Sequence, residues 1–185
     1  MSIDLHTLGL NGAVKVDAVL EAAEIARLAA ELDTEFRSGP GARLFGRIGV
    51  ARLAGPEGAL SSLAVELLGR AARAVRALAF DKRPSANWTV GWHQDRTIAV
   101  RARIDTPGFG PWSIKEGVRH VEPPFEILAR MITMRLHLDD CGPDNAPLRV
   151  ARGSHRLGRV SGAEAPERAA ETEEMICLAR AGDVW

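Results

Sequence analysis

Residues 87–95 read Asn87-Trp88-Thr89-Val90-Gly91-Trp92-His93-Gln94-Asp95. The part before His93 is rich in β-formers, so we predict a strand that ends at Trp92. On an extended chain, residues i and i+2 face the same side about 7 Å apart, so His93 and Asp95 can converge on one ion while Gln94 points away. A non-heme iron(II) centre needs two histidines and one carboxylate on one face of the metal, and this segment offers one of each.

Spacing alone does not select this pair of residues. His137-Leu138-Asp139 is a second His-x-Asp motif, and His120-Val121-Glu122 is a carboxylate variant of it. Each motif also has an ordinary structural interpretation. His93 and Asp95 would then be an exposed loop pair, and His137 a hydrogen-bonded residue of a barrel.

The N-terminal part of the chain has the periodicity of helices. From Asp17 to Phe36 the sequence is rich in Ala, Leu and Glu, and Asp17 is placed to cap the first turn of a helix. The apolar residues that share one face of this predicted helix are Leu28, Leu32 and Phe36. A strand is predicted over residues 44–53 and a second amphipathic helix over 56–74, opened by Pro56. Residues 75–80 fit a helix or a strand.

Past residue 84 the sequence becomes rich in β-formers. Further strands are predicted at residues 97–100, 131–138, 148–151 and 175–179. The stretch 105–124 is rich in Gly and Pro, which predicts a long loop, and long loops in compact domains are often lids. Helices followed by strands indicate a β barrel or sandwich with helices packed on one side.

Composition and charge narrow the class of protein. The 185 residues are 46% hydrophobic and 26% charged, which is ordinary for one globular domain. The 24 Lys and Arg balance the 24 Asp and Glu, so no net charge attracts nucleic acid or an anionic membrane, and we expect a small-molecule substrate. No secretion signal or membrane span is recognisable, so the cytoplasm is the expected compartment. Cys141 and Cys177 are expected to be buried and unpaired.

Several motifs in order resemble one known family. After residues 87–95 and the Gly/Pro-rich stretch come Met134 to Asp140, Asp144-Asn145-Ala146-Pro147-Leu148 and Gly153-Ser154-His155. From about residue 78 to 185 this resembles the phytanoyl-CoA dioxygenase family, which are iron(II)- and 2-oxoglutarate-dependent oxygenases. The resemblance implies a mainly β fold with N-terminal helices, the double-stranded β-helix or cupin-like jelly roll. Residues 1–185 would form one domain, helical to about residue 75 and barrel from about 76.

The resemblance also implies roles for individual residues. His93 and Asp95 would be the first two iron ligands, and Leu78 and Arg135 would line the pocket of the co-substrate 2-oxoglutarate. The histidine of the Gly-Ser-His motif, His155, belongs to a turn and is not a ligand. In the family the third ligand is a histidine on a later strand, followed by an arginine that pairs with 2-oxoglutarate. The chain ends at Trp185, just before the matching position, so we expect a jelly roll that is incomplete at its C-terminus.

The expected activity is oxidation, typically hydroxylation, of a small organic molecule by a dioxygenase that uses iron(II) and 2-oxoglutarate. Two alternatives stay open. One is an inactive barrel that binds a metabolite or a partner, because two ligands alone hold iron weakly. The other is a cupin-like metal-binding protein that uses His93, Asp95 and His137 without 2-oxoglutarate.

Overall fold

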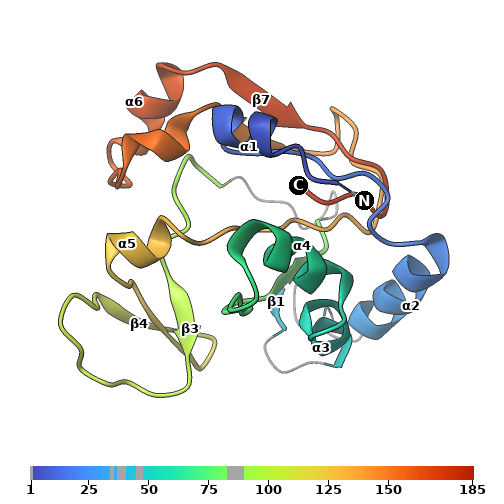
Figure 1. The fold of residues 1–185 in the computed structure, drawn as a ribbon, viewed down its shortest axis with the longest axis horizontal. Coiled ribbons are helices and arrows are strands. Elements are labelled where there is room, and N and C mark those ends of the chain that lie inside the picture. The colour runs from blue at the N-terminus through green and yellow to red at the C-terminus, as the bar shows by residue number, and fades with distance from the viewer. Residues whose placement is uncertain (1, 34–35, 37–40, 45–47, 83–89) are drawn as a thin grey trace. The chain divides into compact units, whose positions relative to one another are not determined.

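The computed structural model describes residues 2–33, 36, 41–44, 48–82 and 90–185, and it divides into two compact units. The first unit is made of residues 1–31, 89–94 and 133–185, and the second of residues 32–88 and 95–132. Figure 1 shows the elements of both units along the chain.

The helices of the first unit are short. The helix α1 (Leu5–Asn11) begins at the N-cap Asp4, whose carboxylate accepts a hydrogen bond from the backbone N–H of Thr7, and the chain leaves it through Gly12 with φ 79°. The helix α2 (Ala22–Asp33) begins in this unit and ends in the second. Two further helical elements are the 3-10 helix η2 (Ser154–Leu157) and α6 (Ala165–Ala170).

Paired extended segments form the centre of the first unit. The strands β6 (Leu148–Ala151) and β7 (Glu174–Cys177) are antiparallel. Beyond β7 the chain continues as a central segment, in which Val184 bridges both Val16 and Leu136, and Ala179 bridges Cys141. Segments that are more than a hundred residues apart in sequence are thereby joined. The apolar side chains buried here are Ile3, Val16, Leu20, Leu28, Cys141, Ala151, Ala165, Ala169, Cys177, Ala179 and Val184.

The second unit is built on antiparallel strands. Its strand pairs are β1 (Gly41–Arg43) with β2 (Leu78–Phe80), and β3 (Ile98–Val100) with β5 (Val118–Val121), which also pairs with β4 (Trp112–Lys115). Residues 75–77, just before β2, connect the two sheets. The N–H of Leu44 donates to the carbonyl of Ala77 at 3.0 Å, and the N–H of Ala99 donates to the carbonyl of Val75 at 3.3 Å. The two sheets are thus hydrogen-bonded to the same short segment.

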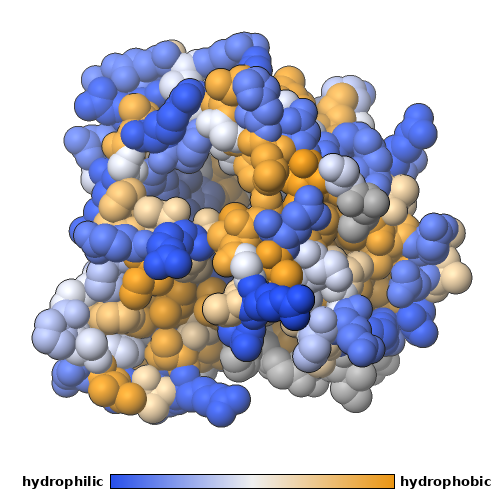
Figure 2. Space-filling view, viewed as in Figure 1, coloured by the Kyte–Doolittle hydropathy of each residue, from blue (hydrophilic) through white to orange (hydrophobic). Residues whose placement is uncertain are grey.

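Among the described residues, the helices that lie wholly in the second unit are α3 (Ile48–Ala54), α4 (Ala59–Leu68) and α5 (Phe125–Leu128). The pair α3 and α4 pack on each other, with Leu53 and Leu63 buried. On the face shown in Figure 2, hydrophilic and hydrophobic residues are interspersed. None of the described helices combines the length and the apolar character needed to cross a bilayer.

Several local predictions from the sequence are confirmed. The strand predicted at residues 148–151 is β6, the one at 97–100 contains β3, and the one at 175–179 overlaps β7. The undecided residues 75–80 end in the strand β2. Leu28 and Leu32 are buried on one face of α2, as their spacing predicts. Both cysteines are buried and free, and burial raises the pKa of the Cys177 thiol to about 11.

Other local predictions are wrong. The predicted strand at 44–53 overlaps the helix α3, which packs on α4 in spite of its β-branched residues. The helix expected from Asp17 begins at Ala22, so Asp17 is not its cap, and α1 was not predicted. The predicted strand at 131–138 forms only an isolated bridge at Leu136. Of the predicted strand that ends at Trp92, residues 87–89 lie outside the described part, and 90–92 are not a strand.

The predicted lid at residues 105–124 is largely a β-hairpin. Its strands β4 and β5 are joined by Glu116 and Gly117, which have φ values of 50° and 76°. Positive φ at both central residues is typical of the tight turn whose twist matches paired strands. The Gly and Pro residues therefore mark the ends and the turn of a hairpin. The alternation of Trp112 and Ile114 with polar residues was the signal for strands.

The fold class is confirmed only at its coarser level. The described residues form several antiparallel sheets with helices beside them, and within these residues no closed barrel is seen. The assignment of residues 1–185 to one domain stays a prediction.

Candidate functional site

His93 is an exposed residue of the first unit with a defined ring tautomer. Its Nδ1 lies 2.7 Å from the carbonyl oxygen of Gly91. A carbonyl can only accept, so Nδ1 carries the proton and donates it, and in the neutral ring Nε2 holds the lone pair. Histidines that bind metals commonly donate their other ring N–H to a backbone carbonyl in this way. His93 therefore has the form that a metal-binding histidine needs.

Asp95 belongs to the second unit and is also exposed, with 44% of its side chain open to solvent. Its Oδ1 accepts a hydrogen bond of 2.6 Å from Nη2 of Arg76. The same guanidinium has its Nη1 3.5 Å from the hydroxyl of Thr97. Arg76 thus holds the carboxylate from one side, and a carboxylate that binds a metal is itself usually hydrogen-bonded.

Gln94 has the most defined side-chain contacts of the motif. Its Nε2 donates to the carbonyl of Gly158 at 2.9 Å, and its Oε1 accepts from the N–H of Val160 at 2.9 Å. The side-chain amide thus pairs with two backbone groups of one segment, all within the first unit. His93 and Asp95 are exposed while Gln94 is half-buried, so burial alternates along the motif as expected for an extended chain.

The chemistry of His93 and Asp95 suits a divalent transition metal such as iron(II), since each is a normal ligand type in its usual hydrogen-bonding state. A non-heme iron(II) centre of this type also needs a third protein ligand. In the part of the chain that the structure describes, no three His, Cys, Asp or Glu side chains gather into a group that could hold a metal.

The histidines of two other motifs, His120 and His155, make contacts that are typical of structural residues. His120 lies on β5 and is 1% exposed, and its Nδ1 donates to the carbonyl of Val118 at 2.9 Å. Glu122, the carboxylate of that motif, is also buried and forms an ion pair of 3.7 Å with Arg96. The ring of His155 packs against the backbone of Gly12, where an added Cβ would overlap its Nδ1. This contact agrees with a structural role for His155.

His137 is buried in the first unit without a complete set of hydrogen bonds. It is 7% exposed, and its Nε2 has no hydrogen-bond partner. The expectation of a hydrogen-bonded ring is therefore not met at this atom. Burial, and next the positive charge of Arg135, lower the pKa of His137, against an opposing effect of Asp183. A neutral ring is favoured.

The two residues expected to line the co-substrate pocket lie in different units. Arg135 is half-buried in the first unit, where its backbone N–H donates to the carbonyl of Trp185 at 2.7 Å. Its charge acts on His137, in agreement with side chains that share a face two residues apart. Leu78 lies on β2 of the second unit and lines a cavity there.

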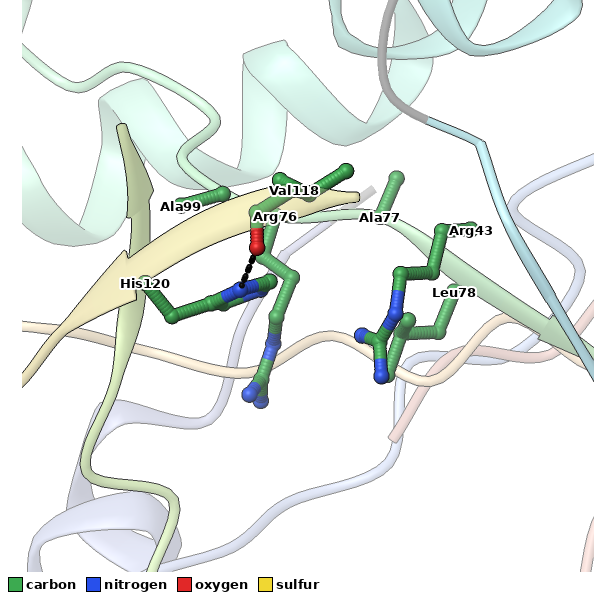
Figure 3. Close-up of a pocket in the computed structure, with 7 residues that line it drawn as sticks. All are labelled: Arg43, Arg76, Ala77, Leu78, Ala99, Val118 and His120. Atoms are coloured by element: carbon green, nitrogen blue, oxygen red, sulfur yellow. Dashed lines mark hydrogen bonds between the residues drawn. The ribbon is translucent and has the colours of Figure 1, made fainter. Parts of the chain in front are cut away.

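The cavity beside Leu78 was not predicted from the sequence. Its volume is about 10 Å³, and the other described residues that line it are Arg43, Arg76, Ala77, Ala99, Val118 and His120. Figure 3 shows the guanidinium groups of Arg43 and Arg76 extending in the same direction, with the His120 ring beside Arg76. No local motif marked these residues, because they come from strands far apart in the sequence.

Comparison with known proteins identifies the family. The chain matches the family model described as phytanoyl-CoA dioxygenase (PhyH) over residues 9–185. The chain therefore belongs to the phytanoyl-CoA dioxygenase family, and the resemblance stated from its motifs is confirmed. Searches of the curated proteins and of the solved structures found no match. The family is one of iron- and 2-oxoglutarate-dependent oxygenases with a cupin-like jelly roll.

Proposed function

We propose that this protein is an iron(II)- and 2-oxoglutarate-dependent dioxygenase that hydroxylates a small organic molecule. The observation that carries the proposal is the state of the His93-Gln94-Asp95 segment in a chain of this family. Nδ1 of His93 donates to a backbone carbonyl, the carboxylate of Asp95 accepts a hydrogen bond from Arg76, and the residue between them is tied to the backbone of another segment.

The roles of the chain's own residues follow from these contacts. His93 would hold the metal through Nε2, because Nδ1 is used by Gly91. Asp95 would hold it through its carboxylate, which Arg76 orients from the other side. Gln94 would fix the path of the backbone between the two ligands. When bound, iron(II) and 2-oxoglutarate together supply the oxidising chemistry, and the protein supplies position and exclusion of water.

For the co-substrate we keep Leu78 and Arg135 as proposed pocket residues. Leu78 would provide an apolar wall, and the guanidinium of Arg135 could pair with a carboxylate in a bidentate way. We further propose a small-molecule substrate, no nucleic-acid or membrane partner, and a cytoplasmic location, in keeping with the balanced charge of the sequence.

The test is the metal content and the turnover of single variants. The protein is loaded with iron(II) under anaerobic conditions, its bound iron is measured, and succinate release from 2-oxoglutarate is followed after oxygen is admitted. His93→Ala and Asp95→Ala are each expected to lower iron affinity at least about tenfold, as loss of a ligand does. The matched controls are His6→Ala and Asp139→Ala, which change exposed residues of the same types. Unchanged iron affinity in both ligand variants would exclude the proposed site.

A second candidate function has one observation in its favour, the unpartnered Nε2 of buried His137. A cupin-like protein would use His93, Asp95 and His137 as metal ligands, with no role for 2-oxoglutarate. His137→Gln separates the two functions. Loss of metal from this variant, with no succinate from the unaltered protein, would favour the cupin-like function over the oxygenase.

A further inference from the structure

The cavity of the second unit is mainly apolar, but two arginines and a histidine are among the residues that line it. Arg43, Arg76 and His120 line it together with Leu78, Ala99 and other apolar side chains, and the two guanidinium groups extend in the same direction (Figure 3). All of these residues belong to the second unit, so the cavity is formed within one compact body.

Arg43 is the side chain in this cavity whose hydrogen bonding is incomplete. Its side chain is 22% exposed, and its Nε is buried with no hydrogen-bond partner. Buried N–H groups nearly always have a partner, so an exception in a folded protein needs a physical reason, such as strain, a catalytic role or a bound water or ion. An unmet donor on a guanidinium points to an anionic acceptor, since an acceptor with a negative charge satisfies it best.

A carboxylate of the chain itself already stands near this donor. Oε2 of Glu116 lies 3.3 Å from Nε of Arg43, yet Nε–H has no hydrogen-bond partner, so the two groups attract each other without being aligned. Glu116 is 64% exposed and can turn away into solvent. The neighbouring Arg76 differs, because Asp95 accepts a hydrogen bond of 2.6 Å from it.

The backbone at Glu116 supports the same interpretation. Glu116 has a φ of 50° in the turn between β4 and β5, where Asn, Asp or Gly is the usual residue. A glutamate at this position is unfavourable for the turn, and local departures of this kind are typical of functional positions. The side chain reaches back from the turn toward Arg43.

We propose that Arg43 binds a carboxylate of the substrate, and that Glu116 occupies the place of this carboxylate until the substrate arrives. The substrate would accordingly be a small organic acid. The cavity of about 10 Å³ has room for one water molecule, so the incoming carboxylate takes the position that Glu116 leaves. Nε and one terminal nitrogen of a guanidinium form a planar fork that matches a carboxylate. Only the assignment of this ligand as the substrate rests on the proposed oxygenase function.

The experiment measures carboxylate binding in the metal-free protein. Propionate is the probe, and the Nε–H signal of Arg43 in a ¹⁵N-correlated NMR spectrum is followed during titration. Metal-free protein is used so that the result does not depend on iron at His93 and Asp95. Iron binding can therefore fail while propionate binding succeeds, and the reverse can also occur.

Two variants and their two matched controls complete the test. Glu116→Gln removes the competing charge and is expected to tighten propionate binding at least about threefold. Glu126→Gln removes an exposed charge of α5 in the same unit and is expected to leave binding unchanged. Arg43→Gln is expected to weaken binding at least about tenfold, followed through the backbone amides of β1, and Arg103→Gln is the matched surface control.

The outcomes that would overturn the proposal are distinct. Absence of saturable propionate binding in Glu116→Gln would exclude the site, as would binding that Arg43→Gln leaves intact. Binding of inorganic phosphate without propionate would exclude a carboxylate ligand. If 2-oxoglutarate bound at least about tenfold more tightly than propionate and depended on Arg43, the site would belong to the co-substrate and not to the substrate.

Discussion

Asp183 in the first unit and Arg43 in the second are both charged side chains taken largely out of water, and their surroundings differ. Asp183 is 4% exposed and accepts hydrogen bonds from the N–H groups of Ala18 and Arg180 and from the ammonium of Lys15. Arg43 has a buried Nε with no hydrogen-bond partner.

The pKa of Asp183 reflects this complete set of partners. Burial alone would raise the pKa, but the hydrogen bonds from Ala18, Arg180 and Lys15 outweigh burial and hold it below 3.8. Asp183 thereby ties the N-terminal segment to the C-terminal one. The comparison separates a buried charge that stabilises the fold from a buried charge that is left ready for a ligand.

Replacement of Asp183 should have the largest effect on stability. Asp183→Ala leaves two backbone N–H groups without their acceptor, while Lys15 keeps Asp17 at 2.6 Å, so we expect a loss of about 2–4 kcal/mol in the free energy of unfolding. Urea denaturation followed by circular dichroism measures it. The control, Asp139→Ala at an exposed site, should stay within about 0.5 kcal/mol. If Asp183→Ala and Asp139→Ala lowered the free energy of unfolding equally, Asp183 would not be a stabilising buried charge.

Gln94 is an uncharged example of a fully paired polar group. Gln94→Ala removes the two hydrogen bonds to Gly158 and Val160, and we expect a loss of about 1–2 kcal/mol. Gln94→Glu keeps the size but removes the donor to Gly158, so it should also be destabilising. Hydrogen exchange at the Val160 amide checks the cause, because its protection should fall in Gln94→Ala. If the Val160 amide kept its protection from exchange in Gln94→Ala, the lost hydrogen bond would not be the cause of the destabilisation.

His137 resembles Arg43 in having a buried, unpartnered nitrogen, and it makes stability depend on pH. Its pKa in the folded state lies below 6.5, the value that an unfolded chain would show. As the pH falls below 6.5, the unfolded state binds the proton first, so this part of the stability is present above 6.5 and is lost on acidification. The loss is at most about 1.4 kcal/mol for each pH unit.

The measurement is urea denaturation at several pH values between 7.5 and 5, for the unaltered protein and for His137→Gln. The difference between the two slopes isolates His137 from other titrating groups. Asp183 acts in a lower range, because its stabilising effect is lost only below 3.8. If the free energy of unfolding changes with pH at the same slope in both proteins, His137 is not the source of the pH dependence.

Replacement of Arg43 should have the smallest effect on stability. Its unmet Nε–H costs free energy in the folded state, so Arg43→Met should change the free energy of unfolding by about 1 kcal/mol or less, in either direction. The same denaturation assay measures it. A loss as large as that of Asp183→Ala would show that Arg43 stabilises the fold and would weaken its assignment as a ligand-binding residue.

The sequence predicted short-range features well. The alternation at His93, Gln94 and Asp95 and the burial of one face of α2 depend on neighbours a few residues away, and the structure has both. The predicted strand at 44–53 and the loop predicted over the whole of 105–124 failed for another reason. The helix α3 is stabilised by packing on α4, and the hairpin needs β3 as a third strand, so neither is determined by its own residues.

By itself the sequence determined the family, and it predicted, without a test so far, the metal-binding motif and the ligand types of that motif. The tertiary structure alone decided what holds these residues. Arg76 meets Asp95 across 19 positions of sequence, and Gln94 meets Gly158 and Val160 across 64 and 66. Periodicity along the chain indicates on which face of a helix or strand a side chain lies. The residue that it contacts on that face depends on the path of the whole chain. The cavity at Arg43 could be found only in the fold for the same reason.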